Sequence, residues 1–276
     1  MKFDYEKLDL HVFTVDHVTV GPEWRTGLFP PVSRVIPYTR IYLPVAGEGS
    51  VECYGKHYTV KPGKILLIPP FADARVHCER FLEKYWLHCN VMLPETRSDV
   101  FFLYGDCIEL DISDQLDYCK RLFEILLNYS KREVRNVSLH HFELRCALRM
   151  LLLGFFHVLS ENIQSGPKHE KLRLLQYINK NLHKKMTLSE LSKVACLHPN
   201  YLCSSFHREM RMPLFEYIHK CRLYYAMELL LWDRLPIGEA AEKAGYTDSH
   251  LLYTHFKKYF GISPRTFVKN YRQIRK

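Results

Sequence analysis

Hydrophobic and polar positions alternate along the chain through residues 38–92. In RIYLPV, the apolar Ile41, Leu43 and Val45 occupy one side of a predicted strand. The segment SVECYGKHYTV is typical of two strands joined by a glycine turn, and KPGKILLIPP and KYWLHCNVM add further strands. Short antiparallel strands at this spacing predict a small barrel or sandwich.

From Asp114 onwards the apolar period becomes helical and predicts two long amphipathic helices, residues 114–131 and 138–160. Their apolar stripes are Leu116, Cys119, Phe123, Leu126 and Leu127, and then Leu139, Phe142, Leu148, Leu152, Phe155 and Leu159. The next segment, SENIQSGPK, has the composition of a linker, and the remainder is helical. We therefore predict an α+β chain with a β-rich domain at 1–160 and an all-α domain at 169–276.

The excess of positive charge is confined to the last 111 residues, which include the predicted all-α domain. The chain has a net charge of +9, and its last 111 residues carry 20 Lys and Arg against 9 Asp and Glu. A basic segment beside a near-neutral one favours a module that binds nucleic acid or another acidic surface, carried by a domain with a different task.

No segment resembles a signal peptide or is apolar for long enough to span a bilayer, so we expect a soluble protein and no membrane partner. The nine cysteines are an odd number without a C-x-x-C pair. Reduced thiols in the cytoplasm fit this usage best.

Two segments of the basic domain repeat one another, starting at Leu188 and at Ile237. Each predicts a helix, a short turn and a second helix. Thr187 and Glu190 form a capping-box pattern in the first unit, whereas in the second a glycine permits the turn and Thr247 or Asp248 can cap the next helix. The duplication of this helix-turn-helix corner is a more specific indication of a nucleic-acid-binding domain than either copy alone.

The second helix of each unit carries a polar face beside its apolar stripe. In the first unit this face comprises Asn200, Cys203, Ser204, His207 and Arg208. In the second it comprises His250, Tyr253, Thr254, Lys257 and Lys258, with Ser249 at the helix start. Short polar groups near a helix start can reach base edges while cations further along engage phosphates, so we expect both faces to contact double-stranded DNA.

Residues 171–270 resemble the DNA-binding domain of the AraC/XylS family. The match rests on NYLCSSFHRE, on the pattern Arg222, Ala226, Leu229 and Leu230, and on IGEAAEKAGYTDSHLLYTHFKKYFGISPRTF. The resemblance implies two recognition helices in successive major grooves. Two departures stand in the first unit: Arg211 replaces a usual glycine, and Cys203 is a poor base-reading group. We expect the first unit to read fewer bases than the second.

Residues 1–160 are similar to the cupin-like barrel and helical dimerisation region of AraC-type sensors, through YLPVAGEGSVECYGKHYTVKPGKILLIPP and YWLHCNV. This resemblance implies a small-molecule effector, often a sugar, bound inside the barrel, and a homodimer. RNA polymerase is a common partner of activators in the family, although no residue here identifies such a contact.

Alternation along the strands supplies the candidate effector-binding residues Arg40, Tyr42, His77, Trp86 and His88. An aromatic ring with nearby hydrogen-bonding groups suits a sugar. By resemblance, Trp86 and His88 lie on the strand that contributes pocket residues in the family.

Two other functions remain as alternatives. A metal-dependent cupin enzyme would need an H-x-H pair, which the strand RIYLPVAGEG lacks, and no catalytic triad or phosphate loop stands out. We therefore expect no enzymatic activity, metal or cofactor. A scaffold whose helical half binds protein is the second alternative.

Overall fold

A computed structural model describes residues 4–26, 36, 38–93, 99–131, 137–162, 169–210, 212–231 and 233–274. Residues 4–93 and 99–162 belong to one compact unit, and residues 169–274 to a second. Among these residues, no helix combines the length and hydrophobicity needed to cross a membrane.

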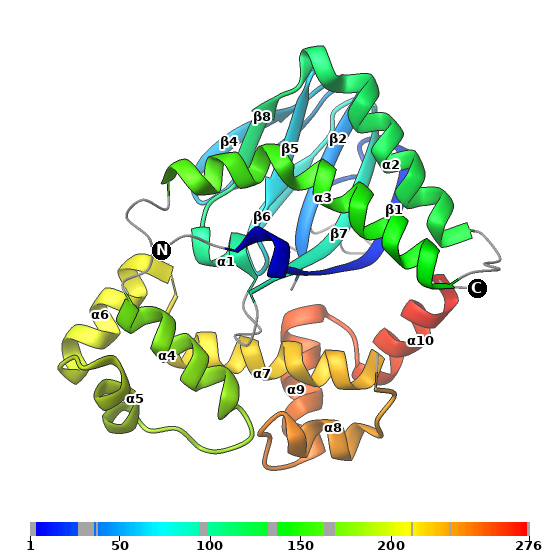
Figure 1. The fold of residues 1–276 in the computed structure, drawn as a ribbon. Helices are drawn as coiled ribbons and strands as arrows, with labels where there is room; N and C mark the ends of the chain where they lie inside the picture. Colours follow the sequence, from blue (N-terminus) through cyan, green and yellow to red (C-terminus); the bar gives the residue numbers. More distant parts are fainter. Residues whose placement is uncertain are drawn as a thin grey trace. The chain divides into compact units, whose positions relative to one another are not determined.

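The first unit contains two antiparallel sheets (Figure 1). The larger sheet has the order β1 (Asp9–Val20), β7 (Leu82–Met92), β2 (Thr39–Gly47), β5 (Lys64–Ile68) and β8 (Ile108–Asp111). The smaller sheet has the order β4 (Lys56–Val60), β3 (Gly49–Cys53) and β6 (Ala74–His77). The strands expected in the four named segments are present, and β1, β6 and β8 are additional. The α+β fold class is confirmed.

The two sheets share one apolar core. Val51 of β3 and Val76 of β6 cluster with Leu66 and Ile68 of β5 and with Leu82 of β7. We call the side of the larger sheet that faces this core the inner face. Side chains alternate along each strand, so the inner face receives every second residue of β2 and β7.

Helices α2 (Leu116–Lys131) and α3 (Val137–Asn162) lie across the other side of the larger sheet (Figure 1). Tyr85 of β7 packs on Phe123 of α2, with ring centroids 5.6 Å apart. Most of the predicted apolar stripes are buried, but Leu139 and Phe142 near the start of α3 are exposed. Helical periodicity located the stripe correctly without showing that the sheet covers only its later part. The short elements η1 (Tyr5–Lys7), α1 (Val100–Tyr104) and η2 (Ser113–Gln115) complete the unit.

The described residues of the second compact unit form helices joined by turns and loops, without a strand. Its helices are α4 (His169–Lys180), α5 (Leu188–Ala195), α6 (Pro199–Met210), α7 (Leu214–Leu231), α8 (Ile237–Lys243), α9 (Ser249–Phe260) and α10 (Pro264–Ile274). Helix α7 lies between the α4–α6 group and the α8–α9 group and contacts helices of both (Figure 1). It buries apolar residues around its circumference, among them Leu223, Ala226 and Met227, because it packs against both groups.

Candidate nucleic-acid interface and effector site

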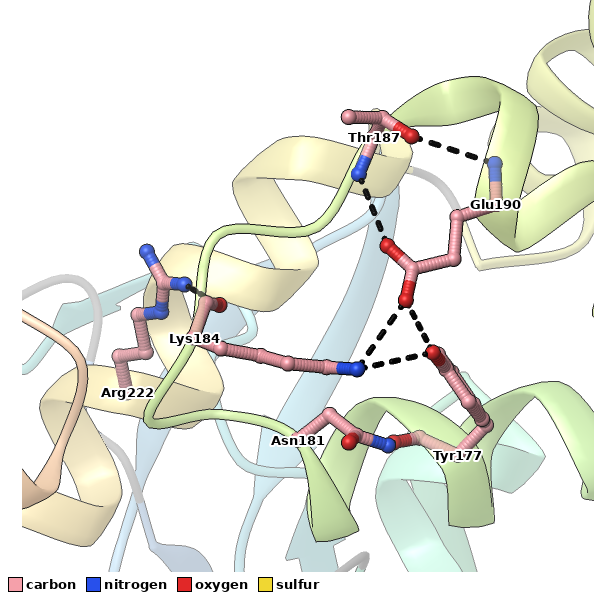
Figure 2. A network of polar contacts seen from close by, with 6 residues as sticks. All are labelled: Tyr177, Asn181, Lys184, Thr187, Glu190 and Arg222. Atoms are coloured by element: carbon pink, nitrogen blue, oxygen red, sulfur yellow. Dashed lines mark hydrogen bonds and ion pairs between the residues drawn. The ribbon is translucent and has the colours of Figure 1, made fainter.

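The first helix-turn-helix unit, α5 and α6, is anchored at the start of α5 by the predicted capping box. The Glu190 backbone N–H donates to Thr187 Oγ1 (3.2 Å), and the Thr187 backbone N–H donates to Glu190 Oε2 (3.5 Å). The other carboxylate oxygen of Glu190 accepts from the Tyr177 hydroxyl and from Lys184 Nζ (Figure 2). The capping residue is therefore tied to α4 and to the loop before α5. This network fixes the direction in which the first unit begins.

Arg222 of α7 links the two helix-turn-helix units. Its Nε donates to the Leu182 carbonyl (2.9 Å), and its Nη2 donates to the Lys184 carbonyl (2.7 Å), both in the loop that leads to α5. Gly245, in the turn between α8 and α9, packs on the same Leu182 carbonyl: a Cβ atom at Gly245 would lie 1.9 Å from that oxygen. The backbone at Gly245 also has a φ of +82°, which glycine tolerates best. Both the close approach of the Leu182 carbonyl and the positive φ therefore disfavour any side chain at Gly245.

The second helix-turn-helix unit, α8 and α9, begins and ends at local sequence signals. The Asp248 carboxylate accepts from the Leu251 backbone N–H (2.8 Å) at the start of α9, so Asp248 is the cap of this helix. Gly261, with a φ of +71°, ends the helix in the left-handed region. The corresponding position of the first unit, Arg211, lies outside the described residues.

Both predicted recognition faces are accessible. Those of their residues that are exposed are Asn200, Ser204, His207, Arg208, Ser249, His250, Thr254, Lys257 and Lys258, whereas Cys203 and Tyr253 are half-buried. The opposite stripes hold α6 and α9 in place: Leu202 and Phe206 are buried in α6, and Leu252 and Phe256 in α9. The same division of faces in the two units leaves each polar face open to a large partner.

Two exposed apolar residues of these helices were not predicted as contacts. Tyr201 of α6 and Leu251 of α9 occupy equivalent positions of the repeat, and both are exposed. An apolar group beside polar base-reading groups can pack on a thymine methyl. Their equivalence in the sequence repeat was the signal that could have identified them.

The candidate effector residues of β2 and β7 lie together on the inner face. Strand pairing sets Arg40 opposite His88 and Tyr42 opposite Trp86. The Trp86 and His88 rings have centroids 4.7 Å apart, and Arg40 Nη2 donates to the Ala72 carbonyl (2.9 Å). This cluster combines aromatic surface with hydrogen-bonding groups.

Burial dominates the protonation of this cluster. Desolvation, with a smaller contribution from the positive charges of Arg40 and Lys84, lowers the pKa of His88 to about 3. Burial raises the pKa of the Tyr42 hydroxyl, and Arg40 offsets part of that shift. At neutral pH His88 is therefore an uncharged imidazole that can both donate and accept a hydrogen bond.

His77 does not join this cluster. It is exposed on β6 and alternates with the core residue Val76, which places it on the outer side of the smaller sheet. There it lines an open groove of about 660 Å³ with Glu48, His57 and Arg80. Among the residues that the structure describes, no group of three or more His, Cys, Asp and Glu side chains is arranged to hold a metal ion.

Lys84 belongs to the inner-face cluster but was not predicted. Its Nζ lies 3.2 Å from the centroid of the Trp24 ring and 4.3 Å from that of Tyr42. The signal was present in the sequence, since Lys84, Trp86 and His88 are successive alternate residues of one strand. Burial of a lysine is unusual enough that alternation alone did not suggest it.

Comparison with known proteins agrees with both halves of the molecule. Residues 191–270 match the family model of a helix-turn-helix domain. The chain is 25% identical over 239 residues to the arabinose operon regulatory protein of Escherichia coli strain K12, covering 82% of this chain and 78% of that protein. The melibiose operon regulatory protein of the same strain is 29% identical over 103 residues, covering 37% of this chain and 34% of the relative.

The fold extends over nearly the whole chain. The crystal structure of ToxT from Vibrio cholerae superposes with a TM-score of 0.55 at 12% identity, covering 95% of this chain and 97% of that chain. Together with the duplicated unit, these relationships show that residues 191–270 form a helix-turn-helix domain of the AraC type. The chain as a whole is similar over most of its length to the arabinose operon regulatory protein.

Proposed function

We propose that this protein regulates transcription in the cytoplasm by binding specific DNA sequences in response to a small molecule, such as a sugar, held at the inner face. The observation that carries the proposal is the pair of equivalent, accessible polar faces on α6 and α9, held by the shared helix α7. The relatives are transcription regulators, and we propose no catalytic activity. We place the functional boundary between residues 160 and 169.

Each recognition face divides into base-reading and phosphate-binding groups. Asn200 and Ser204 in α6 and His250 in α9 are our base-reading candidates, with Tyr201 and Leu251 as apolar neighbours. Further along these helices, His207, Arg208, Lys257 and Lys258 are suited to flanking phosphates. Ser249 and Thr254 complete the second face, whereas Cys203 offers the first face little hydrogen bonding.

The effector site comprises Arg40, Tyr42, Trp86 and His88. A sugar ring can stack on Trp86 while its hydroxyls bond to His88 and Tyr42. Binding changes DNA affinity only if the effector favours one arrangement of the protein over another. His77, on the outer side of the smaller sheet, is not included in this site.

We assign a homodimer contact to the exposed apolar stripe of α3. Phe142, Met150 and Leu153 are all more than half exposed and lie on one side of the helix. A second copy of the chain would cover this stripe. Sedimentation equilibrium should show a dimer for the native chain and a monomer for Leu153→Glu; a dimer of unchanged stability in both would exclude this stripe.

The direct test of the DNA-reading assignment uses a duplex enriched from random DNA by the full-length protein. His250→Ala should reduce discrimination at particular bases, whereas Asn200→Ala should do so at bases about one helical turn away. Fluorescence anisotropy against single-base variants of the duplex measures both. Unchanged base preferences in both variants would refute the assignment of these faces.

A further inference from the structure

Two cationic side chains are buried on the inner face. Arg40 of β2 has 0% of its surface exposed, and Lys84 of β7 has 2%. Arg40 satisfies one N–H through the Ala72 carbonyl, but its Nε has no acceptor in the described part of the chain. Lys84 Nζ lies against the Trp24 and Tyr42 rings, and among the described residues it likewise has no hydrogen-bond acceptor.

Neither cation has a carboxylate within ion-pair distance among the described residues. Several acids of this unit have other partners: Asp106 pairs with Lys56 and Glu109 with Lys64, each at 2.5 Å, and the buried Asp99 accepts from the Thr39 hydroxyl. Asp16, which strand pairing sets opposite Trp86, accepts from the His17 backbone N–H at 2.8 Å.

A buried cation without a counter-ion is costly. Moving an ammonium or guanidinium out of water is strongly unfavourable unless an anion or a full set of acceptors replaces the water, and a cation–π contact returns only part of that free energy. In line with this cost, desolvation lowers the pKa of Lys84 well below its ordinary value. An anion placed beside Lys84 and Arg40 would restore the charged ammonium and supply the missing acceptors.

The surroundings indicate how large such an anion can be. The His88 side chain is half-buried, so part of its ring is not covered by the surrounding core. Trp86, also half-buried, borders the same face, and its ring is close to that of His88. These groups suit the C–H face and hydroxyls of a sugar ring, in addition to the anionic group that the two cations would hold.

We propose that the effector is an anionic sugar derivative, a sugar acid or a sugar phosphate, whose carboxylate or phosphate is bound by Lys84 and Arg40. This inference rests on the effector site proposed above and specifies its ligand class. Arg40 would present its guanidinium to two oxygens of the anion, and Lys84 would act as a point charge. The rings of Trp86 and His88 would orient the sugar.

The test measures ligand-induced thermal shifts of the full-length chain with matched sugars. The panel comprises galactose, galacturonate and galacturonate methyl ester, together with glucose, glucuronate and glucose 6-phosphate. We expect at least one anionic member to raise the Tm, while its neutral parent and its ester do not. A response to uronates alone would assign a carboxylate, and a response to glucose 6-phosphate alone a phosphate.

Two substitutions test whether Lys84 and Arg40 bind the anion. Lys84→Met and Arg40→Met should each weaken binding of the active anion by roughly 100-fold or more, since each removes a buried charge partner of the anion. Lys84→Met should also raise the Tm of the ligand-free protein because it removes an uncompensated charge. Lys61→Met, the same change at an exposed lysine of this unit, should leave both quantities unchanged. If Arg40→Met does not fold, Lys84→Met, which we expect to be more stable than the native chain, still tests the proposal.

Three results would overturn the proposal: stabilisation by a neutral sugar but by no anion, unaltered anion binding in Lys84→Met, or no response to any member of the panel. DNA binding separates this failure from failure of the proposed function. A chain that enriches a specific DNA sequence but binds no anion remains a regulator with a different effector. A chain that enriches no DNA sequence loses the proposed function whatever it binds at the inner face.

Discussion

The two regions of this protein place their positive charges in opposite environments. On α6 and α9, Arg208, Lys257 and Lys258 are exposed and hydrated. On the inner face, Arg40 and Lys84 are buried without a carboxylate among the described residues. An exposed lysine costs almost nothing and is therefore weak support for a partner, whereas a buried one is costly and points strongly to an anion.

The regions also differ in how their sites are held. The recognition helices are fixed by caps and turns close in sequence, such as Asp248 and Gly245. The inner face is assembled by pairing between β2 and β7, which are distant in sequence. Changes to a local signal should therefore damage the stability of the helical unit and DNA binding while effector binding persists. Changes at the inner face should instead damage effector binding and the response of DNA affinity to the effector.

The largest effect is expected from Gly245→Ala. The new Cβ would lie 1.9 Å from the Leu182 carbonyl oxygen at a φ of +82°, so we expect a destabilisation of at least about 3 kcal/mol in the helical unit. Calorimetry and DNA affinity measure it, and effector binding should persist. Gly238→Ala is the matched control, because a Cβ there meets no atom within 4 Å. Equal stability of the two variants would contradict the role given to the Gly245 turn.

The second effect concerns the pH dependence of the stability of the β-rich unit. The pKa of His88 is lowered to about 3 in the folded state, so below its ordinary pKa the unfolded chain binds a proton that the folded chain does not. Stability should therefore fall as the pH is lowered, by up to about 2 kcal/mol between about pH 6.5 and 5. Urea titrations of native protein and His88→Gln should differ by this amount. Identical pH profiles would show that His88 is not desolvated.

A third, smaller effect distinguishes the caps of the two helix-turn-helix units. Asp248→Ala removes the acceptor for the Leu251 N–H, and Thr187→Ala removes the acceptor for the Glu190 N–H. Each should cost about 1 kcal/mol of unfolding free energy. Asp248→Ala should weaken DNA binding more, because we expect the second helix-turn-helix unit to read more bases. The reverse ranking would show that the first helix-turn-helix unit reads more bases.

The smallest effect is a change in salt dependence. Lys257→Ala should weaken binding on all DNA sequences alike and reduce the slope of log K against log salt by about 1, since one phosphate contact is lost. Lys61→Ala, an exposed lysine of the first unit, should leave the slope unchanged. A loss of base discrimination in Lys257→Ala without a change of slope would make this lysine a base reader.

The helical unit could be predicted in more detail than the β-rich unit. Its caps, turn glycine and duplicated faces are local patterns. The sequence therefore narrowed the cap of α9 to two neighbouring residues, Thr247 and Asp248. The inner face depends on pairing between distant strands. Alternation therefore placed Arg40, Tyr42, Trp86 and His88 together, but it could not show that His77 belongs to the outer side of the smaller sheet. Lys84 was missed because its burial follows from the fold and not from its chemistry.

The central claim is that both recognition helices of a ligand-responsive regulator read DNA. Selection of bound sequences from a random DNA pool by the full-length protein at physiological salt tests it most directly. We predict an enriched site containing two motifs about one helical turn apart, one for each of α6 and α9. Binding that depends strongly on salt but enriches no sequence would contradict the claim, because it would leave only a basic surface.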